Sequence, residues 1–305
     1  MNRHLPFEFV LVVALGVFWG LNWPTVKLLL VELAPWTLRG LGLSLGAIGL
    51  AGIALVMRQS LRPRRDEVTP LVVTGLLSIL GFNILTAFGQ LLTETSTAVI
   101  VAFTMPMWAA ILSVLVLGER LTLNRILSLV VGMLGLLVLV SGDITSFAQA
   151  PAGPCFMLGA ALSWAAGTVA LKARTWSIGP VARATWMVGV SAPVTVLGAL
   201  AFEDPLAMAL PSAEALWLLA YHIVFPMIVC HAVWVSLVGR LPASVAAIGT
   251  LLIPVVGVAS AAVVLGDVLG PSKLAALALI LISVILTFWR FDASSQSFVK
   301  SKPSG

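Results

Sequence analysis

Apolar residues in this chain are grouped into long runs separated by short polar links. Each run has about the 20 residues that a helix needs to cross roughly 30 Å of hydrocarbon, and the links are too short to hold a soluble domain. The pattern therefore predicts an all-α polytopic membrane protein with ten transmembrane helices. The predicted runs are 9–31, 36–57, 69–92, 96–117, 123–141, 154–172, 180–202, 214–236, 243–265 and 271–289.

The composition also indicates a membrane protein, because 60% of the residues are hydrophobic and only 10% are charged. A soluble domain has about 25% charged residues. The first run is too long for a secretory signal and lacks a small-residue cleavage site, so we expect it to be retained as the first span. The Ser- and Lys-rich segment 293–305 has no periodicity and is expected to be a disordered cytoplasmic tail.

The distribution of basic residues predicts the orientation in the membrane. With the N-terminus inside, 14 of the 17 Lys and Arg residues fall on the cytoplasmic side, and only Lys27, Arg39 and Lys273 do not. Lys and Arg are retained on the cytoplasmic side of membrane proteins. Both termini are therefore predicted to be cytoplasmic, and the net charge of +5 reflects topology and not nucleic-acid binding.

An internal repeat divides the chain. WGLNWPTVK at 19–27 returns as WAAGTVALK at 164–172, an offset of 145. STAVIVAFTMP at 96–106 matches SVAAIGTLLIP at 244–254, and VLGERL at 116–121 matches VLGDVL at 264–269, both at an offset of 148. Each half holds five predicted spans, and because five is odd the halves cross the membrane in opposite senses. We expect a first repeat at 1–147 and a second, inverted repeat at 148–292.

These segments resemble the drug/metabolite transporter superfamily, specifically its EamA-type ten-helix members. The turn after the fourth span, with Gly118 and Glu119, and its echo at Gly266 and Asp267 carry the resemblance. The resemblance implies ten helices around a central cavity that is formed by helices one, three, four, six, eight and nine. It also implies transport of small organic solutes, often export of amino acids, and within the superfamily the chain most resembles the aromatic amino acid exporters.

Polar residues inside the spans indicate which faces point away from lipid, since a polar side chain facing lipid is costly. In the first span Trp19, Asn22, Trp23 and Lys27 form one stripe at i, i+3, i+4 and i+8. Lys27 is either a cation at the outer mouth or a lysine that reaches the lipid interface. Lys172 is its repeat equivalent, at the inner mouth.

The third span carries a second polar face, which includes Asn83 and Thr86. A shift of 148 places these residues on His231 and Trp234 of the eighth span. They either line the cavity or make the helix-to-helix hydrogen bonds that are common in bundles. His222 is nine residues from His231, so in a regular helix the two histidines do not share a face.

Tryptophan and proline complete the predicted site. Indole rings deep in the spans give flat apolar walls that suit amphipathic or aromatic solutes, although packing is the alternative for each ring. Mid-span prolines at repeat-equivalent positions kink helices and free carbonyls, which favours a role in gating over a plain kink. The remaining residues of the predicted site are Trp108, Trp164 and Thr168 as substrate contacts, and Pro106 and Pro254 as gates.

Missing residue patterns narrow the chemistry. No carboxylate falls within a span away from its ends, so we expect facilitated transport or exchange and not a carboxylate-based pump. The two cysteines are at different depths, and no metal-ligand spacing, P-loop or hydrolase motif occurs, so neither a cofactor nor a metal is expected.

The sequence therefore predicts a carrier and not an enzyme, in the bacterial inner membrane, that moves large neutral or aromatic amino acids out of the cell by alternating access. Its expected partners are the solute and the lipid bilayer, with no nucleic acid and with the oligomeric state open. The alternatives are a carrier for nucleosides, drugs or other metabolites, a lipid-modifying membrane enzyme, and a channel.

Overall fold

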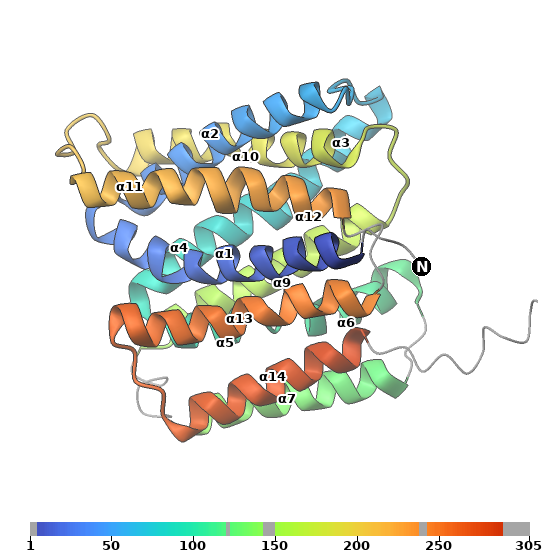
Figure 1. Ribbon diagram of the computed structural model, residues 1–305, viewed down its shortest axis with the longest axis vertical. Coiled ribbons are helices and arrows are strands. Elements are labelled where there is room, and N and C mark those ends of the chain that lie inside the picture. The colour runs from blue at the N-terminus through green and yellow to red at the C-terminus, as the bar shows by residue number, and fades with distance from the viewer. Residues whose placement is uncertain (1–4, 120–122, 143–149, 238–242, 289–305) are drawn as a thin grey trace, which may run out of the picture.

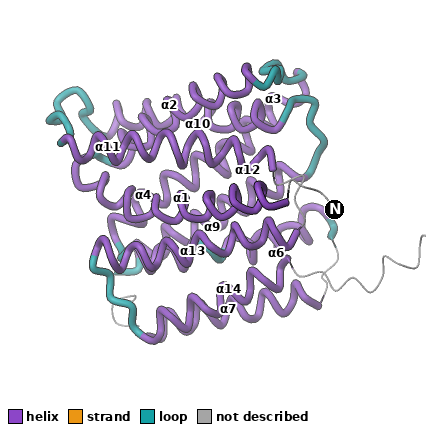
Figure 2. Tube along the Cα trace, in the orientation of Figure 1, coloured by secondary structure: helices purple, strands orange, loops and turns teal. Residues whose placement is uncertain are grey.

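The computed structural model describes residues 5–119, 123–142, 150–237 and 243–288, and these residues form helices and loops without strands (Figures 1 and 2). The predicted tail at 293–305 lies outside them. The helices follow the predicted apolar runs. In chain order they are α1 (Leu5–Glu32), α2 (Pro35–Val56), α3 (Arg65–Gly75), η1 (Leu76–Gly81), α4 (Phe82–Leu92), α5 (Thr95–Ala102), α6 (Met105–Leu117), α7 (Leu123–Gly142), α9 (Ala152–Lys172), α10 (Pro180–Phe202), α11 (Ala213–His222), η2 (Ile223–Cys230), α12 (His231–Leu237), α13 (Ala243–Leu265) and α14 (Pro271–Phe288).

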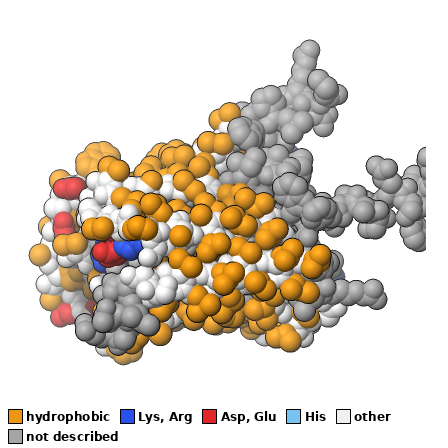
Figure 3. Space-filling model, turned by 90° about the horizontal axis from the view of Figure 1, so that it is seen from below, with side chains coloured by type: hydrophobic (Ala, Val, Ile, Leu, Met, Phe, Trp, Pro, Cys, Tyr) orange, Lys and Arg blue, Asp and Glu red, His pale blue; other side chains and the backbone are white. Residues whose placement is uncertain are grey.

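Length and hydropathy confirm an all-helical polytopic membrane protein. Within the described residues, 7 helical segments are long and apolar enough to cross a bilayer. Three further apolar stretches are shorter, at Ile126–Gly142, Leu251–Leu265 and Pro271–Leu286. The flank of the molecule in Figure 3 is covered with hydrophobic side chains, and the acidic and basic side chains visible there gather at one end. Such a surface suits lipid along the flank and water at the ends.

All helices run between two ends of the bundle (Figure 1). We call the end at which α1 begins the N-side and the other end the far side. The last helix, α14, finishes on the N-side (Figure 1). Helix α9 runs opposite to α1: Gly153 at its start packs against Leu92 on the far side, and Lys172 at its end pairs with Glu119 on the N-side. The first helices of the two halves are therefore antiparallel.

The two halves are joined by reciprocal contacts between α2 and α10, which lie side by side. Glu203, just after α10, accepts hydrogen bonds from the backbone nitrogens of Trp36 at 2.8 Å and Thr37 at 2.7 Å, at the start of α2. Gln59, just after α2, accepts one from the backbone nitrogen of Ala182 at 3.1 Å, at the start of α10. Free N–H groups at the start of each helix are thus bound by a side chain that lies just after the end of the other helix.

Helices α7 and α14 repeat this reciprocity. The Ser128 hydroxyl donates to the Ser283 carbonyl at 2.8 Å, and the Ser283 hydroxyl donates to the Ser128 carbonyl at 2.8 Å. Both serines are buried. A pair of equivalent bonds in both directions is what an approximate twofold axis between the two helices produces.

Close approach of α1 and α13 depends on small residues. A Cβ atom on Gly20 would lie 2.5 Å from the Val256 Cβ, and one on Gly16 would lie 2.7 Å from the Leu252 Cβ. Two glycines at i and i+4 allow helix backbones in membranes to pack closely. This contact joins the first helix of one half to the fourth span of the other.

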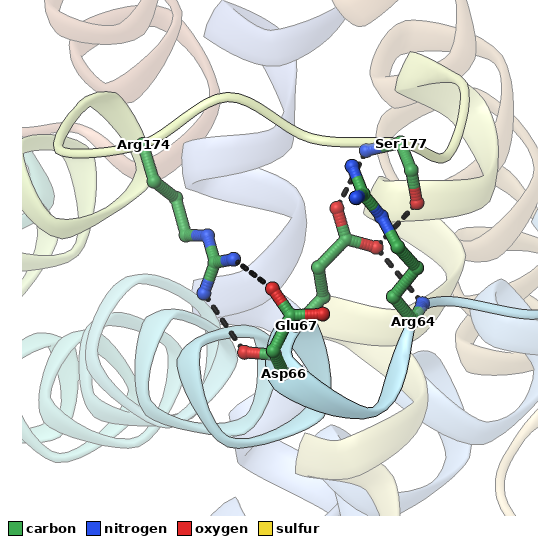
Figure 4. Close-up of polar contacts among 5 residues, drawn as sticks. All are labelled: Arg64, Asp66, Glu67, Arg174 and Ser177. Carbon is green, nitrogen blue, oxygen red and sulfur yellow. Dashed lines mark hydrogen bonds and ion pairs between the residues drawn. The ribbon is translucent and has the colours of Figure 1, made fainter.

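Polar loops on the N-side are held together by Glu67 and Asp66 at the start of α3 (Figure 4). The Glu67 carboxylate accepts hydrogen bonds at 2.5 Å from the backbone nitrogen and from the hydroxyl of Ser177. Asp66 forms an ion pair with Arg174 at 2.7 Å. The start of α3 is thereby fastened to the loop after α9.

Three interruptions break the regular spans. The third span contains the π-helical segment η1, and the eighth contains η2, starting 147 residues later and ending 149 residues after the end of η1. The fourth span ends as α5 at Ala102 and restarts as α6 at Met105, directly before Pro106. Helix α13, by contrast, continues through Pro254. The two prolines that are equivalent in sequence therefore have different effects on their helices.

Candidate functional site

An aromatic cluster, defined here as Trp19, His231 and Trp234, lies where α1 crosses the eighth span. The Trp19 ring is edge-on to His231 at 5.6 Å and to Trp234 at 6.0 Å between ring centroids. The Trp19 indole nitrogen donates to the Pro226 carbonyl at 3.2 Å. The sequence predicted all three residues as substrate contacts, and the structure brings them together across the two halves.

Segment η2 explains how the eighth span presents this cluster. Its wide i→i+5 turns disturb the regular hydrogen-bond ladder around Pro226, which itself lacks an N–H group. The Pro226 carbonyl accepts a hydrogen bond from the Trp19 indole and lies 2.7 Å from His231 Nδ1. A π-bulge of this kind often marks a functional site.

The expectation that His222 and His231 lie on different faces is wrong. His222 Nδ1 is hydrogen-bonded to Asn22 Oδ1 at 2.7 Å, and His231 is beside Trp19. Trp19 and Asn22 are on the same face of α1, so both histidines point to that face. The wide turns of η2 hold extra residues and change the phase between the histidines, which the assumption of a regular helix had fixed.

A polar cluster, defined as Asn22, Arg39, Asn83, Thr86 and His222, adjoins the aromatic cluster. The Arg39 guanidinium donates from Nε to the Asn83 carbonyl at 2.9 Å and from Nη2 to the Thr86 hydroxyl at 3.2 Å. Sequence reasoning predicted Asn22, Asn83 and Thr86 but counted Arg39 only for topology. The position of Arg39 inside the second apolar run could have identified it, because an ionisable residue within a span indicates a function.

The second half has a related arrangement around α9, the repeat equivalent of α1. The Ser163 hydroxyl donates to the Leu77 carbonyl of η1 at 2.6 Å, and the Trp164 ring is edge-on to Phe82 at 5.0 Å. Thr168 is exposed and bonds to the Trp164 carbonyl in its own helix. Trp164 therefore contacts α4, and Thr168 bonds within its own helix.

Two other predicted tryptophans have packing partners. Trp23 is buried between the chain near Phe103 and Gly257 of α13. The Trp108 indole nitrogen donates to the Thr104 hydroxyl at 3.2 Å, across the break between α5 and α6. Their contacts lie within the bundle and do not include the aromatic cluster.

Lys27 lines a far-side cavity of about 470 Å³ together with Glu94 and Asp267. Its ammonium group donates to the carbonyls of Gln90 and Thr93, at the end of α4. A cation beside the last carbonyls of a helix is favourable. Its repeat equivalent Lys172 instead forms an ion pair with Glu119 at 2.8 Å on the N-side. Both lysines are at ends of the bundle, as predicted, but their partners differ.

In the part of the chain that the structure describes, no group of three His, Cys, Asp or Glu side chains is placed to hold a metal ion. Both cysteines, Cys155 and Cys230, are free thiols. The arrangement offers aromatic walls, neutral hydrogen-bonding groups and one buried cation, which suit binding of a solute.

Comparison with known proteins is consistent with this arrangement. The model of the EamA-like transporter family matches residues 7–141 and again residues 151–289. The chain belongs to the EamA-like transporter family. The two matches occupy the segments in which the sequence repeats, and proteins of this family are transporters of small solutes. The resemblance noted in the sequence is therefore confirmed.

Several relatives of this EamA protein are known by name. The uncharacterized transporter YoaV of Bacillus subtilis is 24% identical and covers 80% of this chain and 84% of its own. A probable amino-acid metabolite efflux pump of Salmonella typhimurium is 28% identical and covers 95% and 97%. One solved crystal structure shares the fold, with a TM-score of 0.62 at 19% identity over 90% of this chain and 95% of the other.

Proposed function

We propose that this EamA-family transporter carries large neutral or aromatic amino acids out of the cell by alternating access. Ten spans in two inverted repeats, 1–147 and 148–292, cross the bacterial inner membrane with both termini in the cytoplasm. The substrate binds between the repeats, near the bilayer midplane. Sites at the interface of inverted repeats, built on interrupted helices, are typical of secondary transporters.

The observation that carries the proposal is the aromatic cluster, since Trp19 comes from the first half and His231 and Trp234 come from the second. Rings in edge-on contact offer flat apolar walls, and the adjoining polar cluster offers hydrogen-bonding groups. Such a mixture suits a solute with an apolar side chain and a polar backbone. The name of the Salmonella relative, a probable amino-acid metabolite efflux pump, points to the same class of cargo.

Energy coupling is proposed to be exchange or facilitated transport. Every acidic residue of the chain is at a span end or in a loop. Glu67, the one buried acid in the described residues, is bound to Ser177 at the N-side. Proton relays use ionisable groups inside the membrane, and His222 and His231 are the residues of the two clusters that can accept a proton.

Counterflow in liposomes tests the function. Liposomes that contain the purified protein are preloaded in turn with unlabelled phenylalanine, leucine, alanine, adenosine or a cationic dye. Entry of the same solute in labelled form is then followed with and without a pH gradient. We expect phenylalanine and leucine to drive accumulation, independently of the gradient. Counterflow with adenosine or the dye alone would assign a different cargo, and conductance steps would indicate a channel.

A further inference from the structure

Arg39 is the one lysine or arginine that is buried among residues whose exposure the structure describes, with 3% of its surface exposed. Its bonds are to neutral acceptors, the Asn83 carbonyl and the Thr86 hydroxyl. The one buried acid in those residues, Glu67, is held at the N-side by Ser177 and so is at the other end of the bundle from the start of α2.

A buried cation without a counter-ion is costly. Neutral hydrogen bonds offset only part of the free energy of removing a charge from water, and buried charges in proteins are normally paired. A transporter tolerates such a residue where a bound substrate supplies the opposite charge.

Two further buried polar atoms near Arg39 lack partners. His222 is 0% exposed, and its Nε2 atom has no hydrogen-bond partner. Nε2 lies 3.0 Å from where a Cβ on Gly42 would be, and Gly42 is one turn from Arg39 on α2. On α4, Gln90 is one turn beyond Thr86, and its Oε1 atom is likewise buried without a partner.

Apolar packing closes the region around this cation. Leu38, beside Arg39 in sequence, and Ala87, beside Thr86, are fully buried in one hydrophobic cluster with Val26 of α1 and Ala215 of α11. The cluster joins the four helices that carry the polar groups. A low-dielectric surrounding strengthens the attraction between a cation and an anion.

We infer that Arg39 binds the carboxylate of the transported amino acid. The unpartnered Gln90 Oε1 is an acceptor that suits the substrate ammonium group, and the aromatic cluster, one turn along α1 from Asn22, holds the side chain. Gly42 lets α11 pack closely on α2, so the substrate reaches Arg39 when these helices separate during the transport cycle. This inference rests on the proposed function.

The test compares an amino acid with its amide, in which an uncharged carboxamide replaces the carboxylate while the ammonium group and the side chain are kept. Counterflow of labelled phenylalanine is competed with L-phenylalanine and with L-phenylalaninamide. For the wild-type protein we expect the acid to compete at least about tenfold better than the amide, because a hydrogen bond to a charged group contributes more than a neutral one. A wild-type protein that does not prefer the acid would overturn the inference.

Variants of Arg39 then locate the preference. Arg39→Gln is expected to abolish the acid-to-amide preference, so that the two compounds compete about equally. Arg39→Lys is expected to retain part of the preference, since a lysine keeps the charge but lacks the planar guanidinium group. Thr195→Val is the matched control: it removes a buried hydroxyl on α10 that bonds within its own helix, and it is expected to keep the preference. If Arg39 only linked α2 to α4, Arg39→Gln would weaken competition by the acid and by the amide equally. The acid-to-amide preference would then equal that of the wild type, which would refute the assignment.

Failure of the proposed function and failure of this inference give different results. If the wild-type protein exchanges no amino acid, the proposed function is wrong and the inference falls with it. If amino acids are exchanged but the ratio in Arg39→Gln equals that of the wild type, only the inference is wrong. Where Arg39→Gln does not yield folded protein, the ratio measured for the wild type and for Arg39→Lys still decides.

Discussion

Single residues of the first span show how far side-chain chemistry can be read from sequence. The stripe of Trp19 and Asn22 was predicted from helical spacing, and both residues contact the eighth span. Arg39 was missed as a site residue because it was counted only as one of the three basic residues that do not fall on the cytoplasmic side. Burial of its whole side chain follows from tertiary packing of four helices, which spacing within one helix does not reveal.

Replacing Trp19 tests the aromatic cluster at the residue scale. Trp19→Ala is expected to raise the half-saturation concentration for phenylalanine in counterflow about tenfold, since the loss of ring contacts costs on the order of 1 kcal/mol or more. Trp217→Ala is the control, because Trp217 is 78% exposed on α11, away from the aromatic cluster. Equal half-saturation values for both variants would remove Trp19 from the site.

Elements were predicted better than their interruptions. Apolar runs located the spans, because lipid requires continuous hydrogen-bonded helices of sufficient length. The segments η1 and η2 had no signal in the hydrophobic pattern, since a π-helical turn keeps residues apolar while changing their phase. Proline alone was also a poor guide: the helix breaks next to Pro106 but continues through Pro254.

Helix packing provides a prediction at the element scale. Gly20→Ala is expected to lower the free energy of unfolding by about 1–3 kcal/mol, because its Cβ would overlap Val256 of α13. Gly52→Ala is the matched control, since a Cβ there meets nothing within 4 Å and an alanine favours the helix. Thermal unfolding of the purified proteins in detergent compares the two. A Gly20→Ala protein as stable as Gly52→Ala would mean that α1 and α13 are not in close contact.

At the scale of the whole molecule, the repeat in the sequence anticipated the antiparallel first helices of the two halves. An odd number of spans per half makes inversion a geometric necessity, so this much followed without tertiary information. The contacts between halves did not follow, because they join residues far apart in the chain. Asn22 and His222, for example, are separated by 200 residues, and nothing in either apolar run specifies the other as its partner.

The central claim is that a site between the halves opens alternately to the two sides of the membrane. Accessibility of one cysteine tests it most directly: Asn22→Cys in a protein whose native cysteines, Cys155 and Cys230, are replaced by serine. Ser141→Cys is the control, because Ser141 is exposed near the far-side end of α7.

A membrane-impermeant thiol reagent is added to either side of oriented vesicles, with and without saturating phenylalanine. We predict that Asn22→Cys is labelled from both sides and protected by phenylalanine, whereas Ser141→Cys is labelled from one side only and is not protected. Labelling of Asn22→Cys from a single side, unaffected by phenylalanine, would contradict an alternating-access site at this position.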